Sequence, residues 1–553
     1  MTSIRLIDPR IQVNDISSNV FVVKEGCRSA FTTLPPQSIN TGTLVYQLNN
    51  VGPNSGRSRQ IMMHVVGSTT YTLTGASTFT ADAVGAGQLG FKTGPFNRNC
   101  QSTQHTLGGA TESYLTNQII DIITKFKANS ESLNFFDNFQ PDCTSDYTGS
   151  TLNNISPIVP YGSSIQGSGN FKPRNVGITS VVITGFGALG AVLTIEYDFY
   201  EPLITPFSSV SPEYTPSLWA IDGESIQIQL ANNCTDMFAI SPGVFTGGAA
   251  ATYNVLTTFT KVDMQLEYIT SKNLALPSTS VYKFPKFQVF QTPVGTLAPG
   301  AAAQYTIQVN SQTLPSNLVA FCRQSESLRK STVPDVYATL SSLTVQLDNG
   351  SQILTGATIR DLYNISKRGG SNQDFATFSQ QNLSAVGAVG NFYGAGSVCF
   401  LSPATDLSTW EEAGVTNGSA GKYTLNFNAT FVNNTGTPMT GMTAYVYTIN
   451  EAVLVRQGRT YTTSLVSLSP ELVAASMARP ATTLDEIEYN EMTHVNLFLS
   501  GGAFRHKFFK HLKNAAKLAY DNKDKILEYG KKGLAAYNAY KESKGGDMQM
   551  YYE

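Results

Sequence analysis

The chain reads LVAFCRQSESLRKSTVPDVYATLSSLTVQLDNGSQILTGATIRDLYNISKRGGSNQDF from Leu318 to Phe375, and this stretch carries its clearest local pattern. Two β-rich runs, Leu318–Cys322 and Ser342–Leu347, predict strands. The second run leads into Asn349-Gly350, a dipeptide typical of turns. A short helix is predicted next by the spacing of Ile359, Leu362 and Ile365. The order predicts strands joined by loops, with a helix packed on a sheet.

Similar β-signals recur along the whole chain, and turn clusters such as Asn54-Ser55-Gly56 separate them. The other predicted strands are Asn19–Val23, Thr43–Leu48, Gln60–Val66, Val181–Thr184, Ala191–Tyr197, Ser225–Leu230, Val262–Tyr268, Phe287–Gln291, Tyr305–Val309, Lys422–Phe431 and Ala444–Ile449. A second short helix is predicted by Leu115, Ile119, Ile122, Ile123 and Phe126. Many short strands with Gly- and Ser-rich connections indicate an all-β protein built from antiparallel sandwiches.

A faint internal repeat divides the chain. Thr33-Leu34-Pro35-Pro36 precedes Tyr46-Gln47-Leu48-Asn49, and Thr296-Leu297-Ala298-Pro299 precedes Ile307-Gln308-Val309-Asn310. A strand signal lies on each side of both blocks, and their offset is close to half the chain. The repeat therefore predicts one β-sandwich used twice, with the break near Lys272–Pro285.

Composition agrees with two large β domains. The 553 residues include only 14% charged residues, against about 25% in average soluble domains, and the net charge is −2. A chain of this length buries a large core, which excludes disorder as a description of the whole. The balanced charge gives no electrostatic reason to expect that the protein as a whole binds nucleic acid.

Two features suggest other classes of protein at first reading. The six cysteines lie far apart and form no CxxC motif, so we expect buried free thiols rather than a zinc ribbon or a disulfide scaffold.

Residues 175–195 are uncharged and long enough to cross a bilayer. They also hold four glycines and many β-branched residues, and Gly185-Phe186-Gly187 separates two β-rich runs, so we predict a buried hairpin in a soluble protein.

Catalytic motifs are absent from the sequence. HExxH, GxSxG and GxxxxGK[ST] do not occur. GxGxxG matches occur at Gly85–Gly90 and Gly185–Gly190, but β-rich or helix-breaking residues follow each one, where a nucleotide site needs a helix. We predict a structural protein with no catalytic residues, no metal and no cofactor.

The C-terminal residues differ from the rest. Residues 501–553 carry eleven Lys and Arg against six Asp and Glu. Phe504, Phe508 and Leu512 recur every four residues, which predicts a basic amphipathic helix. Such a helix can contact DNA, a membrane or a partner protein, or can pack on this protein's own surface. The candidate contact residues are Phe504, Arg505, Lys507, Phe508, Lys510, Leu512, Lys513 and Lys517.

The stretch from Leu318 to Phe375, with its L-x-x-A-T-x-x-D-L-Y-x-I-S-x-x-G-G motif, resembles the second jelly roll of double jelly-roll major capsid proteins. The resemblance is closest to polinton-like viruses and virophages, with adenovirus hexons as distant relatives. Three further stretches agree with it, at Tyr200–Phe207, Tyr282–Pro285 and Ala444–Leu472, so the likeness covers about residues 1–475.

This resemblance implies a structural subunit of an icosahedral DNA virus. In the family two jelly rolls stand side by side, and three chains form a pseudo-hexagonal capsomer. The implied partners are two further copies of the chain, neighbouring capsomers, and penton and minor capsid proteins, in a virion assembled inside the infected cell. Gly67–Gly94 and Gln380–Ser397 would be tower or clasp loops, or plain surface loops.

The expected domain organisation follows from the repeat and the resemblance. Residues 1–271 form the first jelly roll, 272–285 a linker, 286–480 the second jelly roll, 481–502 a connecting segment and 503–553 the basic helical tail.

The segment Leu499-Ser500-Gly501-Gly502-Ala503 lies at the boundary before the tail. It resembles the sites that adenovirus-type cysteine proteases cut, and cutting after Gly502 would release the tail. A flexible Gly-Gly hinge before a retained helix is the alternative.

Two other functions remain open at the level of sequence. One is a viral β-sandwich attachment or vertex protein that binds a receptor or glycan. The other is a carbohydrate-active enzyme on a jelly-roll scaffold, which needs facing acids that sequence does not reveal.

Overall fold

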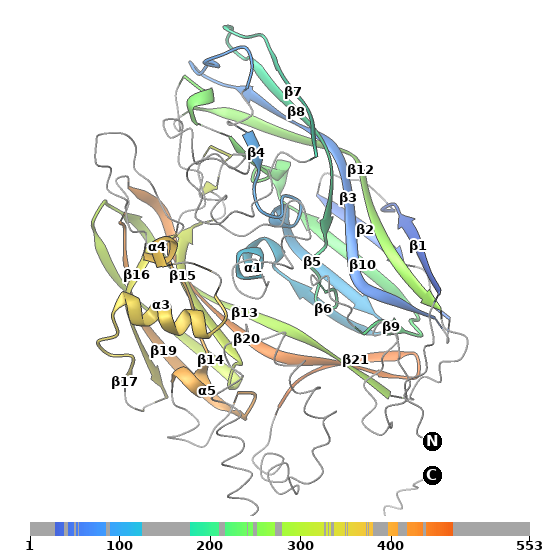
Figure 1. The fold of residues 1–553 in the computed structure, drawn as a ribbon, viewed down its shortest axis with the longest axis vertical. Helices are drawn as coiled ribbons and strands as arrows, with labels where there is room; N and C mark the ends of the chain where they lie inside the picture. Colours follow the sequence, from blue (N-terminus) through green and yellow to red (C-terminus); the bar gives the residue numbers. More distant parts are fainter. Residues whose placement is uncertain are drawn as a thin grey trace, which may run out of the picture. The chain divides into compact units, whose positions relative to one another are not determined.

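The computed structural model describes residues 28–467 with several gaps (Figure 1). The gaps are 38–41, 49–50, 53–54, 85–88, 124–176, 210–215, 241, 247–250, 271–278, 326–327, 330, 333–336, 349, 351, 372, 374, 380–395, 408–416 and 435–437. The predictions for Asn19–Val23, for the connecting segment and for the tail therefore lie outside the described residues.

The first part of the chain forms two antiparallel sheets that enclose one core. One sheet has the order β1-β12-β3-β8-β7 and the other the order β2-β10-β5-β6. The strands are β1 (Arg28–Leu34), β2 (Thr43–Leu48), β3 (Ser55–Leu73), β5 (Cys100–Leu107), β6 (Ala110–Tyr114), β7 (Ile178–Thr184), β8 (Val192–Pro202), β10 (Glu224–Leu230) and β12 (Tyr253–Thr270). The short strands β4 (Leu89–Phe91) and β11 (Phe238–Ile240) pair with each other, and β9 (Leu218–Trp219) pairs with the start of β3.

The second part repeats this arrangement. Its sheets have the orders β13-β20-β15-β18 and β14-β19-β16-β17, and β21 is added beside β20. The strands are β13 (Thr279–Leu297), β14 (Ala302–Thr313), β15 (Asn317–Gln324), β16 (Thr339–Leu347), β17 (Gln352–Ile353), β18 (Val398–Leu401), β19 (Ala420–Val432), β20 (Met439–Gln457) and β21 (Thr460–Leu465).

The two sandwiches have the same topology, strand for strand. If β1 is matched with β13 and β2 with β14, the order β1-β12-β3-β8 becomes β13-β20-β15-β18. In the same way β2-β10-β5-β6 becomes β14-β19-β16-β17. Two four-stranded sheets with this connectivity make a jelly roll. The internal repeat is confirmed, because its blocks lie at the β1–β2 and β13–β14 connections.

Alternation of buried and exposed residues explains why these segments are strands. In β10 every second residue points inward, and Ile226 and Ile228 are fully buried. Each sandwich has its own apolar core, which contains Leu44, Ile61 and Leu193 in the first and Val309, Leu343 and Phe427 in the second. The predicted free thiols are confirmed for the four cysteines that the structure describes, Cys100, Cys234, Cys322 and Cys399, all buried.

Both predicted helices are present between strands, and Phe126 of the first prediction lies outside the described residues. α1 covers Thr116–Ile122, and α3 covers Ile359–Arg368. Thr358 caps α3 and Asp361 completes a capping box, which fixes where the helix begins. The remaining short helices are α4 (Phe375–Ser379), α5 (Pro403–Asp406), η2 (Asn97–Asn99), η5 (Asn232–Cys234) and η6 (Pro242–Val244).

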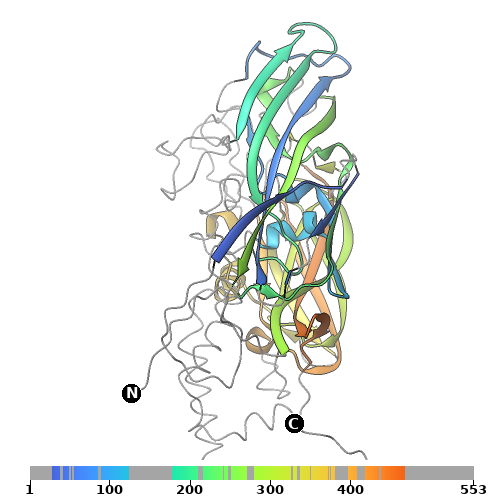
Figure 2. The same cartoon turned by 90° about the vertical axis from the view of Figure 1, so that its right-hand side faces the viewer.

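The predicted hairpin in residues 175–195 exists and is buried in part, because Leu193 and Ile195 of β8 lie in the core whereas the turn is exposed. β7 and β8 pair antiparallel, and the turn between them exposes Phe186 by 50% and Leu189 by 75%. β7 lies at the end of the sheet, and its Ile178, Val181 and Ile183 are only partly buried against the core. The hairpin therefore extends at one end of the first sandwich (Figures 1 and 2).

Two predicted segment boundaries are also corrected. The expected loop Gly67–Gly94 begins inside β3, which continues to Leu73 because Tyr71 and Leu73 face the core between outward hydroxyl residues. The expected linker 272–285 overlaps β13, which starts at Thr279 with Tyr282 and Phe284 buried. Because of Pro285, the sequence did not predict a strand here. β13 accepts this proline because it lies at the edge of its sheet, where a strand can lack a backbone donor on one side.

Candidate functional site: the junction between the sandwiches

Two long strands connect the sandwiches through shared packing. β13 and β20 pair from Thr279–Gln457 to Leu297–Met439, far beyond the usual strand length of about 5–6 residues. One end of this ribbon belongs to the core of the second sandwich. The other end, together with β21, packs on the first sandwich; we call it the arm, residues 279–286, 450–457 and 460–465.

The apolar cluster under the arm contains residues of both sandwiches. Tyr282, Phe284, Ala452, Leu454 and Tyr461 come from the arm, and Leu107, Ala110, Phe207, Leu218 and Ile221 come from the first sandwich. The rings of Phe284 and Phe207 meet edge to face, with centroids 5.2 Å apart. Such contacts make the junction an apolar core of its own.

Hydrogen bonds fix the register of the arm on the first sandwich. The Tyr461 hydroxyl donates to the carbonyl of Trp219 at 2.5 Å, and the Tyr461 amide donates to Gly108 at 3.0 Å. Lys286 pairs with Glu112 at 3.1 Å. Burial raises the pKa of Tyr461, so its phenol stays protonated and remains a donor.

A second shared cluster lies between α1 and the aromatic face of the second sandwich. Ile119, Ile120 and Ile122 of α1 pack with Phe321, Tyr445 and Tyr447. The Tyr447 hydroxyl donates to Gln118 Oε1 at 3.0 Å. The Phe321 and Tyr447 rings stack at 5.6 Å.

The connection between β15 and β16 makes the third contact. Ser331 Oγ lies 2.8 Å from the Tyr71 hydroxyl and donates to the Thr235 carbonyl at 3.0 Å. The Ile240 amide donates to the Ser331 carbonyl at 2.9 Å. Three separate regions therefore tie the second sandwich to the first, and the two sandwiches belong to one compact unit.

A buried charged network lies close to the arm. Arg57 of β3 donates from Nε to Glu224 Oε2 at 3.0 Å, and its Nη2 donates to Oε1. His105 Nε2 lies 2.7 Å from Glu224 Oε1, and its Nδ1 lies 2.9 Å from Thr205 Oγ1. Burial alone would raise the pKa of Glu224, but Arg57 and His105 outweigh it and lower the pKa to about 2.

Thr205, His105 and Glu224 are the residue types of a hydroxyl–imidazole–carboxylate catalytic triad. A substrate could not reach them, because they are buried. Thr205, His105 and Glu224 are all at most 2% exposed, and the rings of His105 and Phe207 pack at 5.0 Å. Burial lowers the pKa of His105, so a neutral imidazole donates to the carboxylate. None of the side chains in this network is an exposed nucleophile or base. The network therefore supports the fold, because it joins β3, β5 and β10 beneath the arm.

Other predicted features are placed as follows. Among the residues that the structure describes, no group of three or more His, Cys, Asp or Glu side chains is arranged to hold a metal ion. No described helix is long and apolar enough to cross a membrane. The protease-site residues Leu499–Ala503 and the tail contacts from Phe504 to Lys517 lie outside the described residues.

The junction residues were missed by sequence reasoning. Tyr461 and Trp219 are 242 positions apart, and no local period connects them. The one available signal was the aromatic content of the predicted strand at Ala444–Ile449, which contains Tyr445 and Tyr447. That signal indicates a buried strand but not its partner.

Comparisons with known proteins agree with this architecture. Residues 286–452 match the family model of the major capsid protein V20 C-terminal domain. The putative capsid protein V20 of the Sputnik virophage is 21% identical over 385 residues, which cover 67% of this chain and 64% of that relative. The match therefore spans slightly less than two thirds of the relative's own length.

Two solved structures share the fold. A chain in the cryo-EM structure of the Sputnik virophage has a TM-score of 0.71 at 19% identity, with 89% of this chain and 98% of that chain covered. The crystal structure of the mavirus major capsid protein has a TM-score of 0.65 at 18% identity, with 83% and 94% covered. The double jelly-roll fold and the resemblance to virophage major capsid proteins are confirmed.

Proposed function

We propose that this chain is a major capsid protein of the virophage type, a structural subunit of a virion shell. The match of residues 286–452 to the capsid-protein family supports this function most directly, because that segment is the second sandwich. The repeated topology and the three contact regions between the sandwiches suit a subunit that has to keep its form in a shell. The relatives named above carry the names of capsid proteins.

The proposed capsomer is a homotrimer. Three chains with two similar sandwiches each would present six comparable edges, which suits a pseudo-hexagonal unit that contacts neighbouring capsomers, penton proteins and minor capsid proteins. The β7–β8 hairpin supports a contact with another copy, since Val182, Phe186 and Leu189 are 51%, 50% and 75% exposed. Apolar side chains gathered at one exposed site are typical of interaction surfaces.

The proposed domain organisation extends to the ends of the chain. Residues 1–271 are the first jelly roll and 279–480 the second, which begins with β13 at Thr279, and 481–502 connects the second jelly roll to the amphipathic helical tail 503–553. The tail faces the capsid interior and contacts DNA, membrane or minor capsid proteins through its basic and apolar residues. Proteolysis within Leu499–Ala503 would release it.

Size-exclusion chromatography with light scattering, followed by electron microscopy, tests the capsid role. We expect a particle of three times the 59.7 kDa chain mass, with a pseudo-hexagonal outline. Leu189→Asp should give monomers that keep the fold of the single chain, because the side chain is exposed there. Gln304→Asp, an exposed position of the second sandwich, is the matched control and should remain trimeric. A wild-type monomer that binds or hydrolyses glycans would overturn the proposal.

A further inference from the structure

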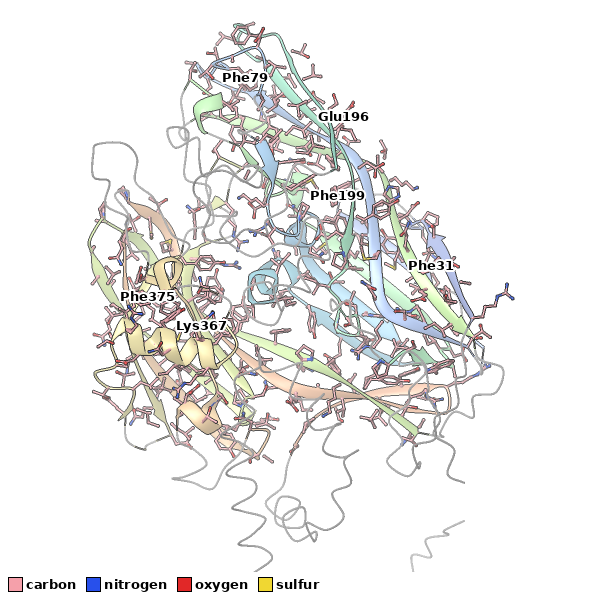
Figure 3. All side chains as sticks on the ribbon, in the orientation of Figure 1. Phe31, Phe79, Glu196, Phe199, Lys367 and Phe375 are labelled. Atoms are coloured by element: carbon pink, nitrogen blue, oxygen red, sulfur yellow. The ribbon has the colours of Figure 1, made fainter. Side chains whose placement is uncertain are left out.

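The β1 edge of the first sandwich is unusually open. β1 pairs with β12, and among the described residues it has no strand on its other side. Its first four residues are exposed, and Phe31 is 79% exposed, the largest value for a large apolar side chain in the described part of the chain. Figure 1 shows β1 at the end of its sheet, and Figure 3 labels Phe31 there.

Comparison with the corresponding strand shows what β1 lacks. Edge strands are normally protected from pairing by lysine, proline or a bulge. β13, its counterpart, carries Lys283, Pro285, Lys286 and Pro293. β1 has no charge or proline from Ser29 to Leu34, and its pairing with β12 is regular throughout. Among the described residues, β1 therefore presents a regular edge, uncharged from Ser29 to Leu34, whose outward backbone donors and acceptors have no strand partner.

The sequence immediately before β1 has the pattern of a strand that fits this edge. Asn19-Val20-Phe21-Val22-Val23 is uncharged and rich in β-branched residues. Lys24-Glu25-Gly26-Cys27 separates it from Arg28, and four-residue hairpin loops are common. Gly26 supplies the residue that accepts positive φ in such a loop.

We propose that Asn19–Val23 folds back and adds to the free edge of β1 in the same chain, as an antiparallel strand. A four-residue loop places Val20 beside Phe31 and Phe21 beside Ala30. Residues opposite each other in an antiparallel pair share a face of the sheet. The added strand thus shields the exposed Phe31 ring and satisfies the open backbone groups of β1. This inference does not depend on the capsid role.

Hydrogen exchange of the full-length protein tests the added strand. Alternate amides of β1 point away from β12, so the new strand should protect them. Val22→Pro removes a donor and disrupts the strand, and it should speed exchange of those amides in Arg28–Leu34 by about tenfold or more. Val13→Pro, in the same N-terminal region but outside the segment, is the matched control and should leave exchange unchanged. Equal exchange in Val22→Pro and wild type would overturn the proposal.

Cross-linking identifies which chain supplies the strand. In a background that carries Cys27→Ser and Cys143→Ser, Val20→Cys and Phe31→Cys are treated with a short bismaleimide that tolerates a shift in register. A cross-link within one chain supports the proposal. A cross-link between chains, seen as a covalent dimer on a denaturing gel, overturns it in favour of strand exchange between copies. Absence of any link between the two cysteines also overturns it.

Discussion

Single buried polar side chains determine how the first sandwich is closed. Glu201 on β8 is fully buried and accepts hydrogen bonds from the backbone amides of Phe96 at 2.8 Å and Asn97 at 2.9 Å. The Asn97 side chain also donates to Glu201 and to the Pro202 carbonyl. One carboxyl group thus holds the connection between β4 and β5 against β8. Burial raises the pKa of Glu201 to about 7, although hydrogen bonds from Asn97 and Phe96 oppose the shift.

The raised pKa of Glu201 predicts that the fold loses stability as pH rises. The folded state binds this proton more tightly than the unfolded chain does, so the contribution is complete below about pH 4.5 and is lost as pH passes about 7. Between pH 5 and 8 it should lower the free energy of unfolding by roughly 3 kcal/mol. Glu201→Gln should lack this component, as measured by chemical denaturation at both pH values. His105 is present in both proteins, so its contribution to the pH dependence cancels when Glu201→Gln is compared with the wild type. The same pH dependence of the free energy of unfolding in the two proteins would contradict the prediction.

Among the glycines that the structure describes, Gly396 is the one at which an added methyl group should cost most. Its φ is +91°, and a Cβ there would lie 2.0 Å from the carbonyl oxygen of Tyr337. We expect Gly396→Ala to lower the free energy of unfolding by about 3 kcal/mol or more. Gly356→Ala is the control, because φ is +80° but nothing lies within 4 Å; it should cost only about 1 kcal/mol. Equal losses in thermal or chemical denaturation would show that backbone strain, not the contact, decides the cost.

At the scale of elements, the sequence predicted strands better than their lengths or partners. All twelve predicted strands that fall on described residues are present, because period-two alternation is a local signal. The other described strands had no predicted range: β1, β4, β5, β6, β9, β11, β17, β18 and β21. Several of them have only two to four residues, and in β5 and β21 polar residues such as Gln104 and Thr462 fill the outward positions. The predicted range Phe287–Gln291 is much shorter than β13, because Pro285 and Pro293 flank it in the sequence. The junction could not be predicted from local sequence patterns, because each of its apolar clusters takes residues from both sandwiches.

The arm offers a direct test at this scale through Tyr461 in β21. Its hydroxyl donates to the carbonyl of Trp219, and the side chain is 1% exposed. Tyr461→Phe keeps the ring and removes the donor, which should cost about 1–2 kcal/mol in free energy of unfolding. Thr462→Val changes the neighbouring exposed hydroxyl of the same strand and should have little effect. Similar denaturation midpoints for Tyr461→Phe and the wild type would show that this hydrogen bond does not stabilise the junction.

At the scale of the whole molecule, the junction couples the two jelly rolls energetically. Each sandwich has its own core, but two further clusters take residues from both, at the arm and at α1. Unfolding one sandwich would expose half of each shared cluster, so its neighbour would lose packing at the same time. A shell subunit benefits from this coupling, because a hinge between the sandwiches would let the subunit deform in the lattice.

We therefore expect one cooperative thermal transition for the two sandwiches, with calorimetric and van't Hoff enthalpies in agreement. Phe284→Ala combined with Phe321→Ala truncates one buried ring in each shared cluster, at about 3–5 kcal/mol apiece, and should separate the transition into two. Leu425→Ala removes a comparable buried side chain from the core of the second sandwich alone. It should lower the midpoint while the transition stays single. Two transitions in the wild-type protein, at the same concentration, would mean that the sandwiches are independent and that the junction is only a contact surface.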